Sequence, residues 1–167
     1  MPGLFRSPLL VRRFLAILCS CGLLSGPVSG GMATPPAAAG ATLDLSAYAG
    51  RVVLVDFWAS WCTPCRRSFP WMNRMLELYA DDGLTIVSVN LDAGRDEAAG
   101  FLAETPARFD IVYDPEGQIA RKYDVIGMPS SYLIGRDGEL LESHIGFRRH
   151  EASEYEQMIR QALEIDE

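Results

Sequence analysis

The segment from Arg51 to Trp58, RVVLVDFW, is a nearly continuous run of β-branched, apolar and aromatic residues. Such a run is typical of a central strand that is buried on both faces of a sheet. From Cys62 to Tyr79 the apolar residues recur instead at helical spacing, and a second buried run follows over 84–89. Strand, helix and strand in close succession predict a βαβ unit.

The remainder of the chain continues to alternate between helices and strands. We expect helices over 95–104 and 118–123 and from His150 onward, and strands over 110–113, 130–134 and 139–145. The last two strands are separated by Gly135-Arg136-Asp137-Gly138, which is a hairpin signal. This order predicts an α/β fold with a mixed central β-sheet and helices on both faces.

Composition limits the classes of partner. The chain has 167 residues and 49% apolar content, which is enough for one domain with a core. Only three arginines precede Asp44, the first acidic residue, so the rest of the chain has 12 basic and 22 acidic residues and a net charge of −10. A nucleic-acid partner is not expected, because phosphates require basic patches.

The amino terminus has the pattern of a targeting segment. Arg12 and Arg13 precede an eleven-residue stretch of apolar and small residues, 14–24. That is the length of a signal-peptide core and is short for a membrane span. We therefore expect an export signal over residues 1–21, a flexible Gly-, Pro- and Ala-rich linker over 22–41, and one domain over 42–167.

The sequence is compatible with two positions at which the export signal could end. Leu18-Cys19-Ser20-Cys21 resembles a bacterial lipoprotein box, in which Cys21 would be acylated and would tether the protein to a membrane. Ordinary cleavage near Gly31-Met32-Ala33 is the alternative. Either route places the domain in the bacterial periplasm or cell envelope, soluble or lipid-anchored, in an oxidising compartment.

The mature domain has two cysteines, Cys62 and Cys65, whose spacing fits a zinc half-site, a structural bridge or a redox couple. Zinc needs four ligands, but His144 and His150 are distant and not at ligand spacing, so no metal site is expected. A bridge across so short a loop contributes only about 2 kcal/mol, and a domain of this size has its own core. A redox couple is the favoured interpretation.

The surroundings of the pair support that interpretation. We expect Cys62 to be exposed at the helix N-terminus, with Pro64 in the first turn, where unpaired N–H groups and the helix dipole stabilise a thiolate. Cys65 lies one turn deeper and should be buried. Asp56 lies within a buried strand, and burying a carboxylate costs free energy unless the group has a partner or a role in function. We interpret it as a proton acceptor beneath Cys65, the alternatives being a bulge or an arginine partner.

Two motifs together resemble one family. Residues 55–65, VDFWASWCTPC, resemble the active-site segment of thioredoxins, and residues 127–134, GMPSSYLI, resemble their cis-proline loop and following strand. The similarity runs from about residue 42 to residue 163, and the fold it implies is thioredoxin-like. The export signal and an extra βα unit over about 91–114 make the chain similar to the exported TlpA/ResA-like branch. Cytochrome-maturation members of this branch commonly have an acid at the position of Ser68. The resemblance therefore does not imply a dedicated role with apocytochrome c.

The resemblance implies roles for individual residues. The Cys62–Cys65 disulfide would be the redox centre, with no further cofactor. Cys62 would attack, Cys65 would resolve, and Asp56 would exchange the proton of Cys65. Pro129 would be cis and shape a groove. Substrate would contact four residues: Trp61, Thr63, Pro64 and Met128.

The resemblance also implies an activity. The chain would be an enzyme, an exported thiol–disulfide oxidoreductase that works reductively on exported proteins with thiols or disulfides. A membrane thiol reductase would supply its electrons. The alternative is a copper or cytochrome-assembly chaperone that uses the same cysteine pair without turnover. Stoichiometric copper retention would favour the chaperone, and catalytic insulin reduction the oxidoreductase.

Overall fold

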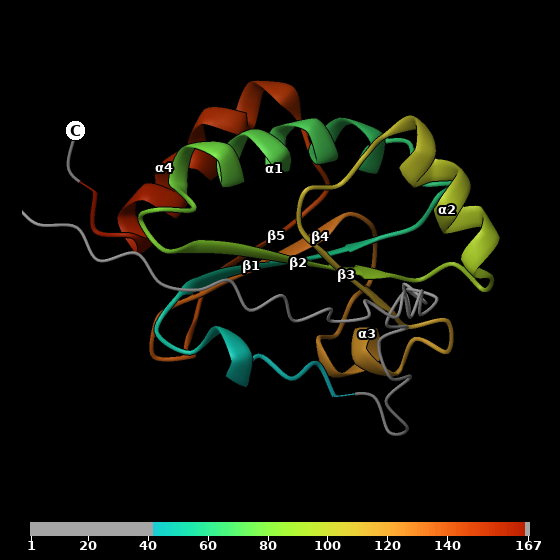
Figure 1. Cartoon of the computed structure of the whole chain (residues 1–167), viewed down its shortest axis with the longest axis horizontal. Coiled ribbons are helices and arrows are strands. Elements are labelled where there is room, and N and C mark those ends of the chain that lie inside the picture. The colour runs from blue at the N-terminus through green and yellow to red at the C-terminus, as the bar shows by residue number, and fades with distance from the viewer. Residues whose placement is uncertain (1–41, 166–167) are drawn as a thin grey trace, which may run out of the picture. The chain divides into compact units, whose positions relative to one another are not determined.

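A computed structural model describes residues 42–165, so the export signal and linker expected over 1–41 lie outside the described residues. Its centre is a five-stranded sheet, in which the strands are β1 (Val52–Trp58), β2 (Leu84–Asn90), β3 (Asp110–Tyr113), β4 (Ser130–Ile134) and β5 (Leu140–Ile145). They are ordered β3-β2-β1-β4-β5, and β1, β2 and β3 are parallel (Figure 1). Because β4 and β5 each run antiparallel to their neighbour, the mixed sheet expected from the sequence is confirmed.

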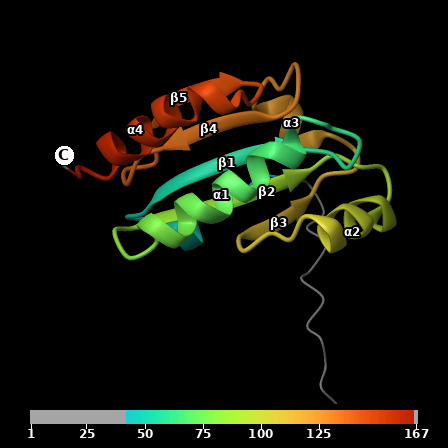
Figure 2. The same cartoon turned by 90° about the horizontal axis from the view of Figure 1, so that it is seen from above.

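Helices cover both faces of this sheet. One face carries α1 (Cys65–Tyr79), α2 (Arg95–Glu104) and α4 (Ala152–Ala162), and the other carries α3 (Gln118–Lys122) and a 3-10 turn (Ser46–Tyr48) (Figures 1 and 2). The region between β2 and α3 contains the additional helix and strand that were expected there. Within residues 42–165, no helix combines the length and apolar character needed to cross a membrane.

Two helix starts differ from the prediction. α1 begins at Cys65 and not at Cys62, because residues 59–62 form a turn and Pro64 is the N-cap. The last helix begins at Ala152, because residues 149–151 form a 3-10 turn before it. Helix ends are the least certain feature of a periodic pattern, since a turn of 3-10 geometry continues the same spacing.

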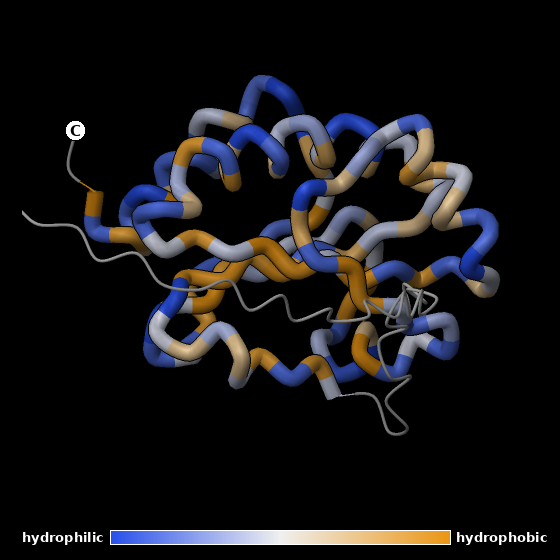
Figure 3. Tube along the Cα trace, viewed as in Figure 1, coloured by the Kyte–Doolittle hydropathy of each residue, from blue (hydrophilic) through white to orange (hydrophobic). Residues whose placement is uncertain are grey.

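Strand β1 divides the core into two clusters. All seven of its residues are buried, and Figure 3 shows hydrophobic residues gathered along the central sheet. Side chains of a strand alternate between the faces. Val52, Leu54 and Trp58 pack towards α1, α2 and α4, whereas Val53, Val55 and Phe57 pack towards α3. Asp56 therefore projects from the sheet on the α1 face, which is also the face where Cys62 and Cys65 are buried.

Candidate active site

The two cysteines lie where the chain passes from β1 into α1. After Trp58 the chain makes a turn in which the backbone N–H of Cys62 donates to the carbonyl of Ala59 at 3.0 Å. The N–H of Cys65 then donates to the carbonyl of Cys62 at 3.1 Å, and α1 begins. Cys62 and Cys65 are joined by a disulfide. The geometry places a redox-capable bond at the carboxyl end of the central strand.

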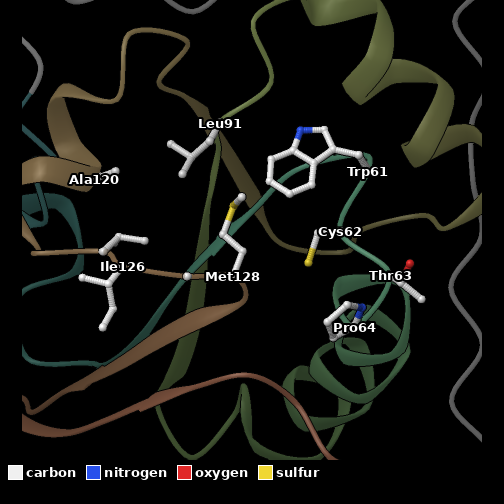
Figure 4. A pocket seen from close by; sticks show the side chains of 10 residues that line it. Trp61, Cys62, Thr63, Pro64, Leu91, Ala120, Ile126 and Met128 are labelled. Carbon is white, nitrogen blue, oxygen red and sulfur yellow. The ribbon is translucent and has the colours of Figure 1, made fainter.

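The sulfur of Cys62 receives a direct hydrogen bond from the helix start. The N–H of Cys65 lies 3.3 Å from Cys62 Sγ. Such a bond stabilises the thiolate when the disulfide is reduced. Cys65 is completely buried, as expected, but Cys62 is only 4% exposed, so the exposed position expected for it is wrong. Its sulfur faces a groove whose walls cover it, and access to Cys62 runs through that groove (Figure 4).

The groove beside Cys62 has a volume of about 510 Å³. It is lined by Trp61, Cys62, Thr63, Pro64, Leu91, Ala120, Val125, Ile126, Gly127 and Met128 (Figure 4). The four residues expected to contact substrate are all part of this lining. Two large apolar side chains of the lining are strongly exposed, Trp61 at 71% and Ile126 at 86%. The groove can therefore offer apolar contact to a partner next to the reactive sulfur.

The cis-proline expected from the sequence is present. The peptide bond between Met128 and Pro129 is cis. Met128 lines the groove, and its side chain lies opposite Trp61 and Cys62 in Figure 4. Sequence reasoning did not single out Ile126 or Leu91. Their only signal was their position, next to the proline motif and just after β2.

Asp56 is an incompletely satisfied buried acid. It is 1% exposed, and its Oδ1 accepts a hydrogen bond from the Ser131 hydroxyl at 2.7 Å. Its Oδ2 is buried without a hydrogen-bond partner in the described part of the chain. Burial raises the pKa of Asp56 to about 7, although the bond from Ser131 acts in the opposite direction. The alternatives of a bulge or an arginine partner are wrong, because Asp56 is buried in a regular strand and pairs with a serine.

A second buried acid, Asp92, holds the loop that leads to Cys62. Its carboxylate accepts the backbone N–H of Ser60, at 2.9 Å to the nearer oxygen, and the Ser60 hydroxyl at 2.9 Å. The side-chain amide of Asn90 donates to it at 2.7 Å. Sequence reasoning missed Asp92, which follows the end of β2 and lacks a motif of its own. The pairing of β1 with β2 brings it beneath the turn.

The basic residue nearest the start of α1 is turned away from the sulfurs. Arg66 pairs with Glu104 of α2 at 2.8 Å, and its guanidinium lies over the ring of Phe101. Ser68, also in the first turn, is buried and donates to the carbonyl of Cys65 at 3.1 Å. Helix α1 therefore does not direct the charge of Arg66 towards Cys62.

Neither histidine lies in the groove lining. His144, in β5, stacks on Tyr155 of α4 with ring centres 4.1 Å apart, and the side chain of His150 is largely exposed. Across residues 42–165, no three His, Cys, Asp or Glu side chains gather in a cluster that could hold a metal ion.

Comparison with known proteins relates the whole arrangement to one family. The model of the Redoxin family matches residues 32–159. Thiol-disulfide oxidoreductase ResA of Bacillus thuringiensis subsp. konkukian is 30% identical over 115 residues, which cover 69% of this chain and 66% of that protein. ResA of Bacillus subtilis is 30% identical over 103 residues, 62% of this chain and 58% of that protein. The chain thus matches slightly less than two thirds of the length of these curated relatives.

Solved structures give the same result. A crystal structure from Chlorobium tepidum, designated thiol:disulfide interchange protein DsbE, has a TM-score of 0.70 and 52% identity over 71% of this chain and 84% of that one. StoA of Bacillus subtilis has a TM-score of 0.57 and 26% identity, over 66% of this chain and 83% of that one. Both have the fold described above.

Proposed function

This chain belongs to the Redoxin family, and from that premise we propose that it is an enzyme, a thiol–disulfide oxidoreductase whose redox centre is the Cys62–Cys65 disulfide. One observation carries the proposal: the disulfide opens an α-helix, and Cys62 lines an apolar groove on whose far side lies the cis Met128–Pro129 bond. A purely structural bridge needs no groove beside it. The names of the relatives, thiol-disulfide oxidoreductase and thiol:disulfide interchange protein, support the same activity.

In the reductive direction the reaction has two exchanges. The Cys62 thiolate attacks one sulfur of a partner disulfide, the partner S–S bond breaks, and the second partner sulfur leaves as a thiolate that takes up a proton. Cys65 then loses its proton and attacks Cys62 Sγ in the mixed disulfide. The Cys62–Cys65 bond forms and the first partner sulfur leaves. Two electrons pass from the cysteine pair to the partner, and no further cofactor is needed.

Asp56 is the group we propose to accept the proton of Cys65. It faces the same core as both cysteines, and its pKa of about 7 lets it exist in both protonation states near neutral pH. A general base works best when its pKa lies near the working pH. The unpartnered Oδ2 leaves one oxygen available for the proton.

The setting we propose is the bacterial cell envelope. The sequence over residues 1–21 supports export, with Cys21 as the acylation site if the protein is tethered. The partners would be exported proteins with thiols or disulfides, and a membrane thiol reductase would return electrons to the pair. The apolar rim formed by Trp61 and Ile126 would hold an extended segment of the partner.

The test is turnover followed by trapping. The purified protein should accelerate the reduction of insulin by dithiothreitol, and Cys62→Ser should abolish that acceleration. Cys65→Ser should accumulate a mixed disulfide with insulin, because attack occurs but resolution does not. Absence of turnover in the unaltered protein would overturn the proposed activity. Trapping by Cys62→Ser in place of Cys65→Ser would reverse the assigned order of the cysteines.

A further inference from the structure

Among residues 42–165, Asp92 is a buried carboxylate that accepts hydrogen bonds from three donors and forms no salt bridge. It is 5% exposed, and its partners are the backbone N–H and hydroxyl of Ser60 and the amide of Asn90. All three donors are neutral groups. The negative charge of Asp92 is therefore stabilised locally but is not cancelled, and a charge in such surroundings is weakly screened.

The carboxylate of Asp92 is hydrogen-bonded to Ser60, two residues before Cys62 in the chain. Ser60 is the second residue of the turn that the N–H of Cys62 closes on the carbonyl of Ala59. Leu91, the neighbour of Asp92, donates its N–H to the carbonyl of Trp58 and lines the same groove as Cys62. The carboxylate is thus bound by hydrogen bonds to the turn that leads into Cys62.

Neither Asp56 nor Arg66 compensates for this charge. From β1, Asp56 adds a second buried acid on the face of the cysteines. From α1, Arg66 is paired with Glu104 of α2. The groove lining has no charged side chain among the described residues. Electrostatics at Cys62 is therefore a balance between helix-start N–H groups, which favour the thiolate, and buried carboxylates, which oppose it.

We propose that Asp92 is a positioning residue that makes the Cys62–Cys65 couple more reducing by opposing the Cys62 thiolate. A couple becomes more oxidising when its reduced form is stabilised, and the thiolate is the main source of that stabilisation. Converting the Cys62 thiolate and the Cys65 thiol to the disulfide releases one proton and two electrons, and it removes the anion that Asp92 repels. The carboxylate thus favours the direction in which the protein gives electrons to a partner disulfide. In naming that direction, the inference rests on the proposed function.

The test measures the potential of the couple without requiring turnover. The protein and its Asp92→Asn variant are equilibrated with a series of glutathione redox buffers, and the fraction of disulfide is measured. Asn keeps an oxygen that can accept the Ser60 N–H but removes the charge. We expect the equilibrium to shift about two- to fivefold towards the dithiol, which corresponds to about 10–20 mV at 29.6 mV per tenfold change. The pKa of Cys62, measured by iodoacetamide alkylation of the reduced protein, should fall by about 0.5–1 unit.

Asp81→Asn is the matched control. Asp81 is exposed and follows the carboxyl end of α1, which lies about 21 Å along the helix axis from Cys65, so its removal changes the net charge equally but at a distance. It should leave both the equilibrium and the Cys62 pKa unchanged. Equal shifts in Asp81→Asn and Asp92→Asn would mean that overall charge, and not Asp92, sets the potential.

Two further variants separate the effect of the Asp92 charge from the effect of its hydrogen bonds to the loop. Asp92→Glu keeps the charge and should retain most of the reducing potential. Ser60→Ala removes one hydrogen bond to the loop but keeps the charge, and should also leave the potential near that of the unaltered protein. If Ser60→Ala shifts the equilibrium as far as Asp92→Asn does, or if Asp92→Asn shifts nothing, the inference is overturned. The expected shift in Asp92→Asn without insulin reduction by the unaltered protein would instead overturn the proposed activity, while the effect of Asp92 on the potential would stand.

Discussion

Asp56 and Asp92 are two buried carboxylates near the same cysteine pair, and they accept different numbers of hydrogen bonds. Asp92, just after β2, accepts hydrogen bonds from three donors. Asp56, within β1, accepts one from Ser131, and its second oxygen has no partner in residues 42–165. Hydrogen-bond donors offset the cost of burying a carboxylate, and where donors are few, as at Asp56, burial raises the pKa. The difference separates an acid that holds a loop from an acid suited to proton exchange.

Because the pKa of Asp56 is raised in the folded protein, the free energy of unfolding depends on pH. Burial raises this pKa from an ordinary value of 3.8 to about 7. The folded protein therefore binds the proton more tightly than the unfolded chain. The stability linked to Asp56 is fully present below about pH 4 and is lost as the pH rises towards and through 7.

The largest expected effect is the removal of the Asp56 charge. Asp56→Asn cannot ionise, so at pH 8 it should be more stable than the unaltered oxidised protein by about 4 kcal/mol. Its free energy of unfolding should also lose the decline between pH 4 and pH 8. Urea denaturation at a series of pH values measures both. Parallel pH profiles for the two proteins would show that Asp56 does not ionise in this range.

Removing the carboxylate of Asp92 should have the opposite sign. Asp92→Ala leaves the Ser60 N–H and the Asn90 amide without their acceptor, and each unpaired buried donor costs about 1–3 kcal/mol. We expect a net loss of about 2–3 kcal/mol in the free energy of unfolding. The exposed Asp81→Asn serves as the control, with little change expected. A gain in stability would show that Asp92, like Asp56, is a strained charge, and the comparison would fail.

The sequence was sufficient to predict the helices and strands and to identify the site residues that belong to motifs. The continuous buried run of β1 and the switch to helical spacing after it placed the cysteine pair at a strand–helix junction. The carboxylate of Asp56 was conspicuous because it interrupted an apolar strand. The resemblance supplied the cis bond before Pro129, which no periodicity encodes.

Contacts between segments far apart in the chain could not be predicted in the same way. Ser131 meets Asp56 because β4 pairs with β1 in one particular register, and Asp92 meets Ser60 because β2 pairs with β1. A one-residue change in either register would turn those side chains to the other face. The burial of Cys62 likewise depends on groove walls contributed by distant loops.

A smaller effect concerns the rate at which Cys65 reacts. Asp56→Asn should slow the second exchange near neutral pH by about tenfold, equivalent to about 1.4 kcal/mol, because the proton of Cys65 loses its acceptor. An aromatic disulfide that releases a coloured thiolate at each step separates attack by Cys62 from resolution by Cys65. The first release should change much less than the second. Equal rates for the second release across pH 6–9 would rule out a role for Asp56 in proton transfer.

The smallest effect tests the single hydrogen bond that Asp56 receives. The Ser131 hydroxyl stabilises the carboxylate form, so Ser131→Ala should raise the pKa of Asp56 further, by about 0.5–1 unit, for a bond worth about 1 kcal/mol. Carbon-detected NMR of the Asp56 carboxyl through a pH titration measures this directly. Ser131→Thr keeps the hydroxyl and should titrate near the unaltered protein. The decline in stability should then be complete only at a higher pH in Ser131→Ala, since Asp56 stays protonated longer. An unchanged carboxyl titration in Ser131→Ala would mean that burial alone sets the pKa of Asp56, and that the number of donors does not explain why this carboxylate binds its proton so tightly.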